Sequence, residues 1–135
     1  ALPGDEKEAA AQYVVEDDQL HYVIIAFEKG ASLNEQKIAI SDYNLKYHKL
    51  DKLRISNIFL GTDPNNSMPL VVIRRFKDKA EAMTYYEGVQ KNQGDFIDPS
   101  ETPYEMFAIS QNNYRQILRE KSLKGYRAFF ELNYR

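Results

Sequence analysis

The sequence predicts an α+β domain with the ferredoxin-like βαββαβ arrangement and additional C-terminal helices. Three observations predict it: strand-like and helix-like segments follow in that order, two of the strands are apolar almost throughout, and five aromatic residues lie between positions 114 and 134. A right-handed crossover in each strand–helix–strand unit then gives the strand order 4-1-3-2. The two most apolar strands occupy the centre of that sheet.

The first half of the predicted fold is a strand, a helix and a second strand. His21–Phe27 is a continuous β-rich run, which is typical of a strand covered on both faces. Asn34 is the predicted N-cap of a helix that ends before Asp51. Four residues of that helix fall on adjoining rows: Ile38, Tyr43, Leu45 and Tyr47. Residues 53–60 alternate between apolar and polar side chains at first, which predicts a partly exposed strand.

The second half begins with a hairpin, because residues 61–67 are a dense cluster of turn formers. Residues 70–76 form the third strand, and Asp78 with Glu81 makes a capping pair for the next helix. Tyr85 is predicted to face away from the core. The predicted buried stripe of this helix is Ala82, Met83, Tyr86 and Val89.

A surface loop over 95–103 is predicted to lead into the fourth strand, residues 104–109. Ser110, Asn112 or Asn113 then caps a helix that carries Tyr114, Ile117 and Leu118. The last helix is expected to be firmly anchored by Leu123, Tyr126, Phe129, Phe130 and Tyr134.

The central strands indicate what these C-terminal helices do. A four-stranded sheet with one face in water has alternating strands. Neither central strand alternates regularly between apolar and polar residues here, so we expect the aromatic helices to cover the second face. Residues 20–135 are thus interpreted as one domain, and residues 1–19, rich in acids and alanines, as a linker or N-terminal arm.

Composition excludes several classes of function. With 18 basic and 20 acidic residues, the chain lacks the excess positive charge of a nonspecific nucleic-acid binder. The absence of cysteine excludes disulfides and thiolate chemistry. Its two histidines, His21 and His48, are separated by a predicted helix, so we expect no metal and no cofactor. No run of 18 apolar residues is present to insert in a membrane, and the start, without methionine or a signal core, suggests a processed or excised piece.

Particular residues argue against two alternatives, an acylphosphatase-like enzyme and an RNA-recognition domain. An acylphosphatase-like site would use Lys29, Gly30 and Asn57, but one glycine beside an acid makes a poor anion-binding loop. An RNA-recognition domain would need an aromatic motif that residues 70–76 lack. Glu105 has no partner that the sequence identifies, so paired-carboxylate catalysis has no support. We therefore expect no enzymatic activity.

Three arginines are the predicted partner-binding residues. Arg54 lies on the second strand, and Arg74 and Arg75 lie at the end of the third, its neighbour in the predicted sheet. A basic rim beside an exposed sheet edge can meet a partner protein. Two arginines at a strand end are also typical of a merely solvated rim.

Several segments resemble the C-terminal domain of large tetratricopeptide-repeat lipoproteins of Bacteroidetes, including the PorW/SprE-type components of type IX secretion and gliding motility. The segments that carry the resemblance are residues 40–44, 54–60, 72–86, 107–114 and 126–134. The resemblance implies a periplasmic protein-binding module of a larger, outer-membrane-anchored lipoprotein, with envelope or secretion-system proteins as partners.

A second likeness supplies the alternative function. Residues 72–86 also resemble the second half of the SPOR domain, a ferredoxin-like fold that binds peptidoglycan glycan strands on its open sheet face. The apolar central strands and the aromatic C-terminal helices predicted here disfavour that mode of binding, whereas binding at a sheet edge stays open.

Overall fold

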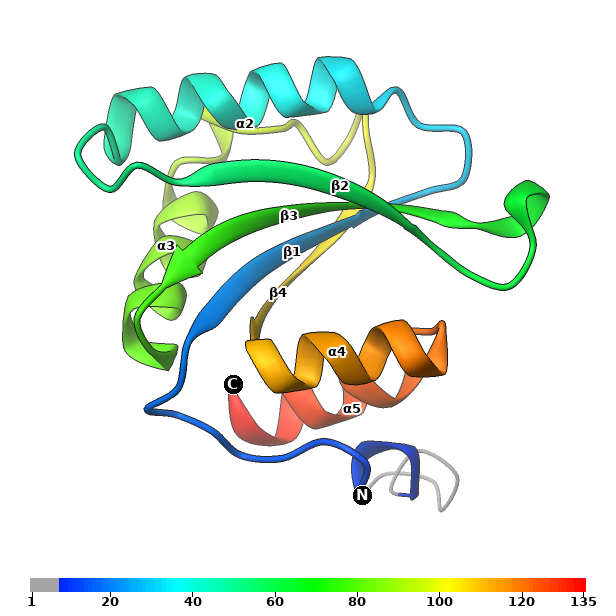
Figure 1. Ribbon diagram of the computed structural model, residues 1–135. Helices are drawn as coiled ribbons and strands as arrows, with labels where there is room; N and C mark the ends of the chain where they lie inside the picture. The colour runs from blue at the N-terminus through cyan, green and yellow to red at the C-terminus, as the bar shows by residue number, and fades with distance from the viewer. Residues whose placement is uncertain (1–7) are drawn as a thin grey trace.

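In the computed structural model, which describes residues 8–135, an antiparallel four-stranded sheet has helices on both sides (Figure 1). The strands are β1 (His21–Phe27), β2 (Arg54–Leu60), β3 (Met68–Phe76) and β4 (Tyr104–Ser110). Their spatial order is β2-β3-β1-β4, which is 4-1-3-2 when it is read from the β4 edge. The predicted α+β class and the four strands are confirmed.

The register places apolar side chains of neighbouring strands in rows on each face. Ile24 of β1 lies opposite Val72 of β3 and Phe107 of β4. Every residue of β1 is buried, because helices cover this central strand from both sides. This double coverage explains the absence of alternation in the sequence of β1.

The first face is covered by α2 (Leu33–Tyr47) and α3 (Lys79–Lys91). For α2, two sequence predictions are wrong. Its N-cap is Ser32 rather than Asn34, and Ile38 and Leu45 are 63% and 62% exposed. The apolar residues of α2 are spread around the helix, so the sequence does not define its buried row. That row consists of Gln36, Ile40, Tyr43 and Asn44.

Tyr85 of α3 is fully buried, which corrects the prediction that it faces away. Positions 82, 85, 86 and 89 follow the three- and four-residue steps of one helical stripe, and Tyr85 belongs to it. Its hydroxyl donates a hydrogen bond to Asn44 Oδ1 at 2.6 Å, so its polar end is satisfied inside the core. The predicted helix start is confirmed, since Asp78 accepts from the Glu81 amide at 2.9 Å.

The connection from α3 to β4 contributes to the core, contrary to the prediction of a surface loop. Phe96 and Ile97 are buried, and the Phe96 ring lies 5.2 Å from that of Tyr43 in an edge-to-face contact. Short 3₁₀ turns occur at Gln93–Asp95, before this loop, and at Pro64–Asn66, in the β2–β3 hairpin.

On the other face lie α4 (Gln111–Glu120) and α5 (Lys124–Asn133) (Figure 1). Ser110 caps α4 by accepting the Asn113 amide at 3.2 Å. In α5, the Tyr126 hydroxyl donates to the Ala108 carbonyl of β4 at 2.6 Å. The Phe130 ring meets Phe107 edge to face at 5.3 Å. The aromatic residues of the last helix thus anchor it over β4, as the sequence predicted.

The segment before β1 lies along α4 and α5. Tyr13 is buried, with its ring 5.2 Å from Tyr126. Gly125 allows the close approach of this segment, because a Cβ there would lie 2.8 Å from the Ala9 carbonyl oxygen. Part of the region interpreted as a linker or arm, residues 8–19, is therefore packed against the domain; residues 1–7 lie outside the described part.

Candidate partner-binding groove

The three predicted arginines line one cavity of about 620 Å³ at one end of the sheet. Arg54 begins β2, Arg74 and Arg75 lie near the end of β3, and the antiparallel register places Arg54 directly opposite Arg74. The cavity is also lined by Lys52, Tyr22 of β1 and Gln111 at the start of α4. We call it the arginine groove.

Arg74 is the most firmly positioned of these cations. Its guanidinium lies 5.8 Å from the centre of the Tyr22 ring, a cation–π distance, and donates a long hydrogen bond of 3.4 Å to Ser56 Oγ. The Gln111 side chain in turn donates to the Tyr22 hydroxyl at 3.0 Å, and Tyr114 contacts the same ring edge to face. The tyrosine that supports Arg74 is thus held on two sides by α4.

The groove carries an excess of positive charge, with four cations and one carboxylate in its lining. Among the residues that the structure describes, Lys52, Arg54, Arg74 and Arg75 form no ion pair, and all four are exposed. The lining includes one carboxylate, Asp51, which His48 Nδ1 contacts at 2.9 Å. Such a cluster attracts an anion, and the attraction is weakened by salt.

The charge of Arg74 also affects the pKa of Tyr114. Burial raises the pKa of the Tyr114 hydroxyl, while the positive charge of Arg74 acts in the opposite direction. Tyr114 therefore stays neutral near pH 7 and can only donate or accept hydrogen bonds there. In this groove the arginines and Lys52 supply the positive charge.

The residues of the acylphosphatase alternative do not converge. Lys29 donates to Asn66 of the hairpin at 3.2 Å, whereas Asn57 accepts from Lys37 of α2 at 3.0 Å. Both contacts are structural polar pairs, so nothing here assembles an anion site from Lys29 and Asn57.

The two histidines have separate structural roles. His21 is buried, with Nδ1 at 2.7 Å from the Gln19 carbonyl and Nε2 at 2.6 Å from the Tyr134 hydroxyl. Burial lowers its pKa, which the nearby carboxylates of Asp17, Asp78 and Glu16 oppose. Within residues 8–135 there is no cluster of three side chains suited to hold a metal ion.

Sequence reasoning missed the partner of Glu105. Both of its oxygens accept from Arg127 of α5, at 2.7 and 2.8 Å, in a bidentate pair. Glu105 and Phe107 lie on the same face of β4, because side chains alternate along a strand, and α5 covers that face. The placement of α5 brings Arg127 to Glu105, and an arginine binds a carboxylate well in this geometry.

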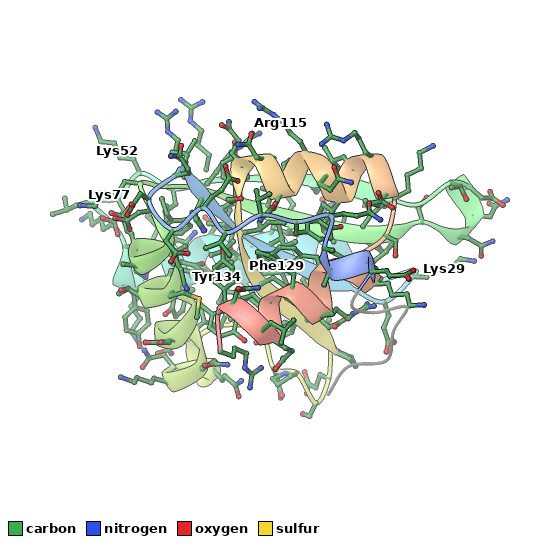
Figure 2. All side chains as sticks on the ribbon, turned by 90° about the horizontal axis from the view of Figure 1, so that it is seen from below. Lys29, Lys52, Lys77, Arg115, Phe129 and Tyr134 are labelled. Carbon is green, nitrogen blue, oxygen red and sulfur yellow. The ribbon has the colours of Figure 1, made fainter. Side chains whose placement is uncertain are left out.

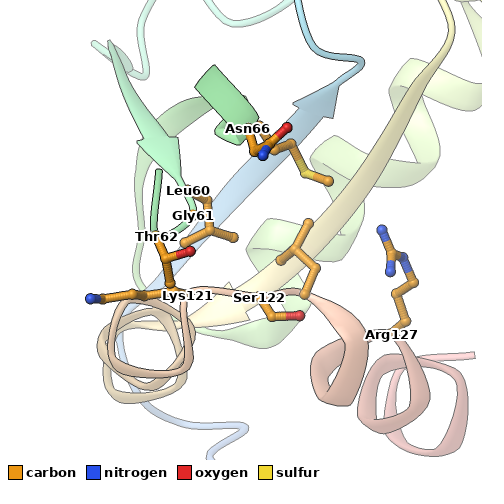
Figure 3. A pocket seen from close by; sticks show the side chains of 9 residues that line it. Leu60, Gly61, Thr62, Asn66, Lys121, Ser122 and Arg127 are labelled. Carbon is orange, nitrogen blue, oxygen red and sulfur yellow. The ribbon is translucent and has the colours of Figure 1, made fainter. Parts of the chain in front are cut away.

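A smaller cavity of about 280 Å³ lies at the other end of α4, between the β2–β3 hairpin and the turn from α4 to α5 (Figure 3). Leu60 and Gly61 line it from the strand side, and Ser122 and Arg127 from the helix side. We call it the hairpin cavity. No pattern in the sequence predicts this cavity.

No family model, no curated protein and no solved structure matches the chain. In residues 8–135, none of the helices combines the length and the apolar character needed to cross a membrane.

Proposed function

We propose that this chain is a non-enzymatic protein-interaction domain that binds an envelope partner through the arginine groove. The observation that carries the proposal is the convergence of Arg54, Arg74 and Arg75, with Lys52, on one groove without any paired acid among the described residues. Arginine is a common anchor residue in interfaces, because its planar guanidinium can donate two parallel hydrogen bonds to one carboxylate.

We further propose that the domain is ferredoxin-like, with the C-terminal helices closing the second sheet face over β1 and β4. The sheet order and the contacts of Tyr126 and Phe130 support this assignment. The fold positions the groove, because the second face stays uncovered at the end where β2 and β3 carry the arginines.

The cellular setting that we propose is the periplasm, as part of an outer-membrane-anchored tetratricopeptide-repeat lipoprotein of the type IX secretion or gliding kind. Its support is the resemblance of five segments, among them residues 72–86 and 126–134. Its envelope or secretion-system partners would present acidic groups to the groove.

A pull-down from envelope extract tests the proposed binding residues. The triple variant Arg54→Ala, Arg74→Ala, Arg75→Ala should lose the proteins that the parent chain retains, because it removes three of the four groove cations. Recovery of the same proteins by this variant would reject the site.

A matched control removes three cations elsewhere: Lys29→Ala, Lys91→Ala and Arg119→Ala. Lys29 lies at the end of the molecule away from Lys52 (Figure 2). Arg119 donates to Gln116, which in turn contacts Gln12 of the N-terminal segment, so it lies on the side of α4 away from β2. Both triple variants have the same net charge, and only the groove variant should lose partners.

Peptidoglycan binding is the alternative function, based on the SPOR-like likeness of residues 72–86. The covered face over β1 and β4 leaves little of the open sheet that such binding uses. Sedimentation with purified sacculi separates the two proposals. A protein adaptor stays in the supernatant, whereas a glycan-binding domain sediments with the cell wall.

A further inference from the structure

Helix α4 has a cavity at each of its ends, and both cavities lie between this helix and the β2–β3 pair. The arginine groove is lined by Gln111, the first residue of α4, and by Ser56 of β2. The hairpin cavity is lined by Lys121, the C-cap of α4, and by Leu60 at the end of β2. The two cavities are therefore the ends of one flank of α4, which we call the β2 flank.

The surface between the two cavities follows β2. Ser56 lines the first cavity and Leu60 the second, and Ile58 lies midway on the same side of the strand because side chains alternate. Ile58 is half-buried, and Leu118 of α4 is 39% exposed. At about 3.3 Å per residue, seven residues of extended peptide cover the length of β2, roughly 20 Å.

The two ends of this flank differ in chemistry. The arginine groove is cationic, as described above. The hairpin cavity combines the apolar side chains of Leu60, Met68 and Leu123 with the uncharged polar side chains of Thr62, Asn66 and Ser122. Of its two cations, Arg127 is paired with Glu105, and the Lys121 side chain extends away from Arg127 (Figure 3). Figure 2 shows Arg115 of α4 and Lys52 projecting toward the same side of the molecule.

We propose that the β2 flank binds an extended acidic peptide segment of the partner protein, with carboxylates in the arginine groove and an apolar side chain in the hairpin cavity. This inference rests on the proposed function and specifies its ligand. Charge complementarity selects the occupant, because four cations without paired acids among the described residues line one end.

The support of Arg74 by Tyr22 favours a carboxylate ligand of defined position. A guanidinium already held against an aromatic ring loses less conformational freedom when it binds. Arg54 lies opposite Arg74 in the register, so the guanidinium groups of two adjacent strands can bind the same ligand. Binding should weaken as salt is added, since the groove cations are exposed.

Fluorescence anisotropy with labelled peptides tests the inference. The long probes are Glu-Glu-Ala-Ala-Ala-Ala-Leu and its reversed sequence, which cover both chain directions, and the short probe is Glu-Glu-Ala. We expect one long probe to bind about tenfold more tightly than the short one, from the added contact at the hairpin cavity. In the Arg54, Arg74, Arg75 triple alanine variant, the affinities for that long probe and for the short probe should each fall about tenfold or more. The Lys29, Lys91, Arg119 variant should bind these two probes as tightly as the parent chain does.

A second variant tests the hairpin cavity without touching the arginines. Ser122→Trp places a large side chain at an exposed position that lines this cavity. It should reduce the affinity of the long probe to that of the short one and leave the short probe unchanged. Circular dichroism of each variant establishes that it is folded before its binding is compared.

Three results would overturn the inference: no binding of either long probe, equal affinities of long and short probes, or binding that the arginine variant retains. These results are distinguishable from failure of the proposed function. If the arginine variant loses envelope partners while no probe binds, the interaction site stands and the acidic peptide is wrong. If the probes bind but the arginine variant still captures the envelope partners, the partner binds another surface.

Discussion

The two flanks of α4 differ in how fully their polar side chains are hydrogen-bonded. On the flank facing residues 8–19, Asn113 makes two hydrogen bonds to the Val14 backbone, at 3.1 and 2.8 Å. Glu16 accepts from Ser110 at 2.9 Å and from Asn112 at 2.8 Å. On the β2 flank, Arg74 makes one long hydrogen bond of 3.4 Å to Ser56, and its guanidinium lies against the ring of Tyr22.

This difference separates structural polar groups from those available to a ligand. Buried donors and acceptors must be paired for the fold to be stable, which is why Asn113 and Ser110 have partners. Exposed cations without paired acids contribute little to stability, and their mutual repulsion opposes folding slightly. We therefore propose that the cluster in the arginine groove serves binding rather than folding.

The largest expected effect comes from removing the aromatic anchor behind the N-terminal segment. Tyr126→Ala deletes a fully buried ring that contacts Tyr13, Phe107 and Phe129, together with its hydrogen bond to Ala108. We expect a loss of about 4 kcal/mol in the free energy of unfolding. Urea denaturation followed by circular dichroism measures it; a loss below about 1 kcal/mol would contradict the packing described.

Asn113→Ala should have a smaller but clear effect. It leaves the amide and carbonyl of Val14 without their protein partner, and we expect a loss of about 2 kcal/mol. Hydrogen exchange of residues 8–19 should rise in this variant, while exchange in β2 stays as in the parent. A uniform rise over the whole domain would show that the segment of residues 8–19 and the flank of α4 facing it are not a separate unit.

Lowered pH should reduce the free energy of unfolding, because acid protonates the buried side chain of His21. Because burial lowers the pKa of His21 in the folded state from 6.5, the unfolded chain takes up the proton first. Stability is then fully present above the unfolded pKa and falls as the pH drops through 6.5 toward the lowered folded pKa.

His21→Gln isolates this contribution from the carboxylates that also titrate in acid. The free energy of unfolding of the parent and of the variant is compared at about pH 8 and about pH 5. The decrease on acidification should be smaller in the variant. An equal or larger decrease would show that His21 does not titrate as its burial requires.

The smallest effect is expected on the β2 flank. The Arg54, Arg74, Arg75 triple alanine variant should change the free energy of unfolding by no more than about 0.5 kcal/mol, since these side chains have no ion pair to lose. The same urea experiment measures it. A loss of about 2 kcal/mol or more would assign the arginines a structural role and remove the contrast between the flanks.

The strands were predictable because their signals are local. Runs such as His21–Phe27 and turn formers such as those at 61–67 identify elements without knowledge of the rest of the fold. The anchoring role of α5 was predictable for the same reason, since Tyr126 and Phe130 recur at helical spacing. The buried row of α2 was not, because Ile38 and Leu45 are apolar yet face solvent, while Asn44 is buried by its bond to Tyr85.

The site was predictable in part. Strand neighbours bring Arg54 and Arg74 together, and the sequence order of the strands was enough to expect this. The support of Arg74 by Tyr22, the Glu105–Arg127 pair and the hairpin cavity depend on where α4 and α5 lie over the sheet. No local pattern encodes that placement, so these features required the structure.

Hydrogen exchange of the chain, measured with and without the partner captured from the envelope, tests most directly whether the β2 flank is the binding surface. We expect slower exchange in β2, at the end of β3 and in the first turn of α4, with little change in α2 and α3. Protection confined to α2 and α3, with β2 and α4 unchanged, would contradict it.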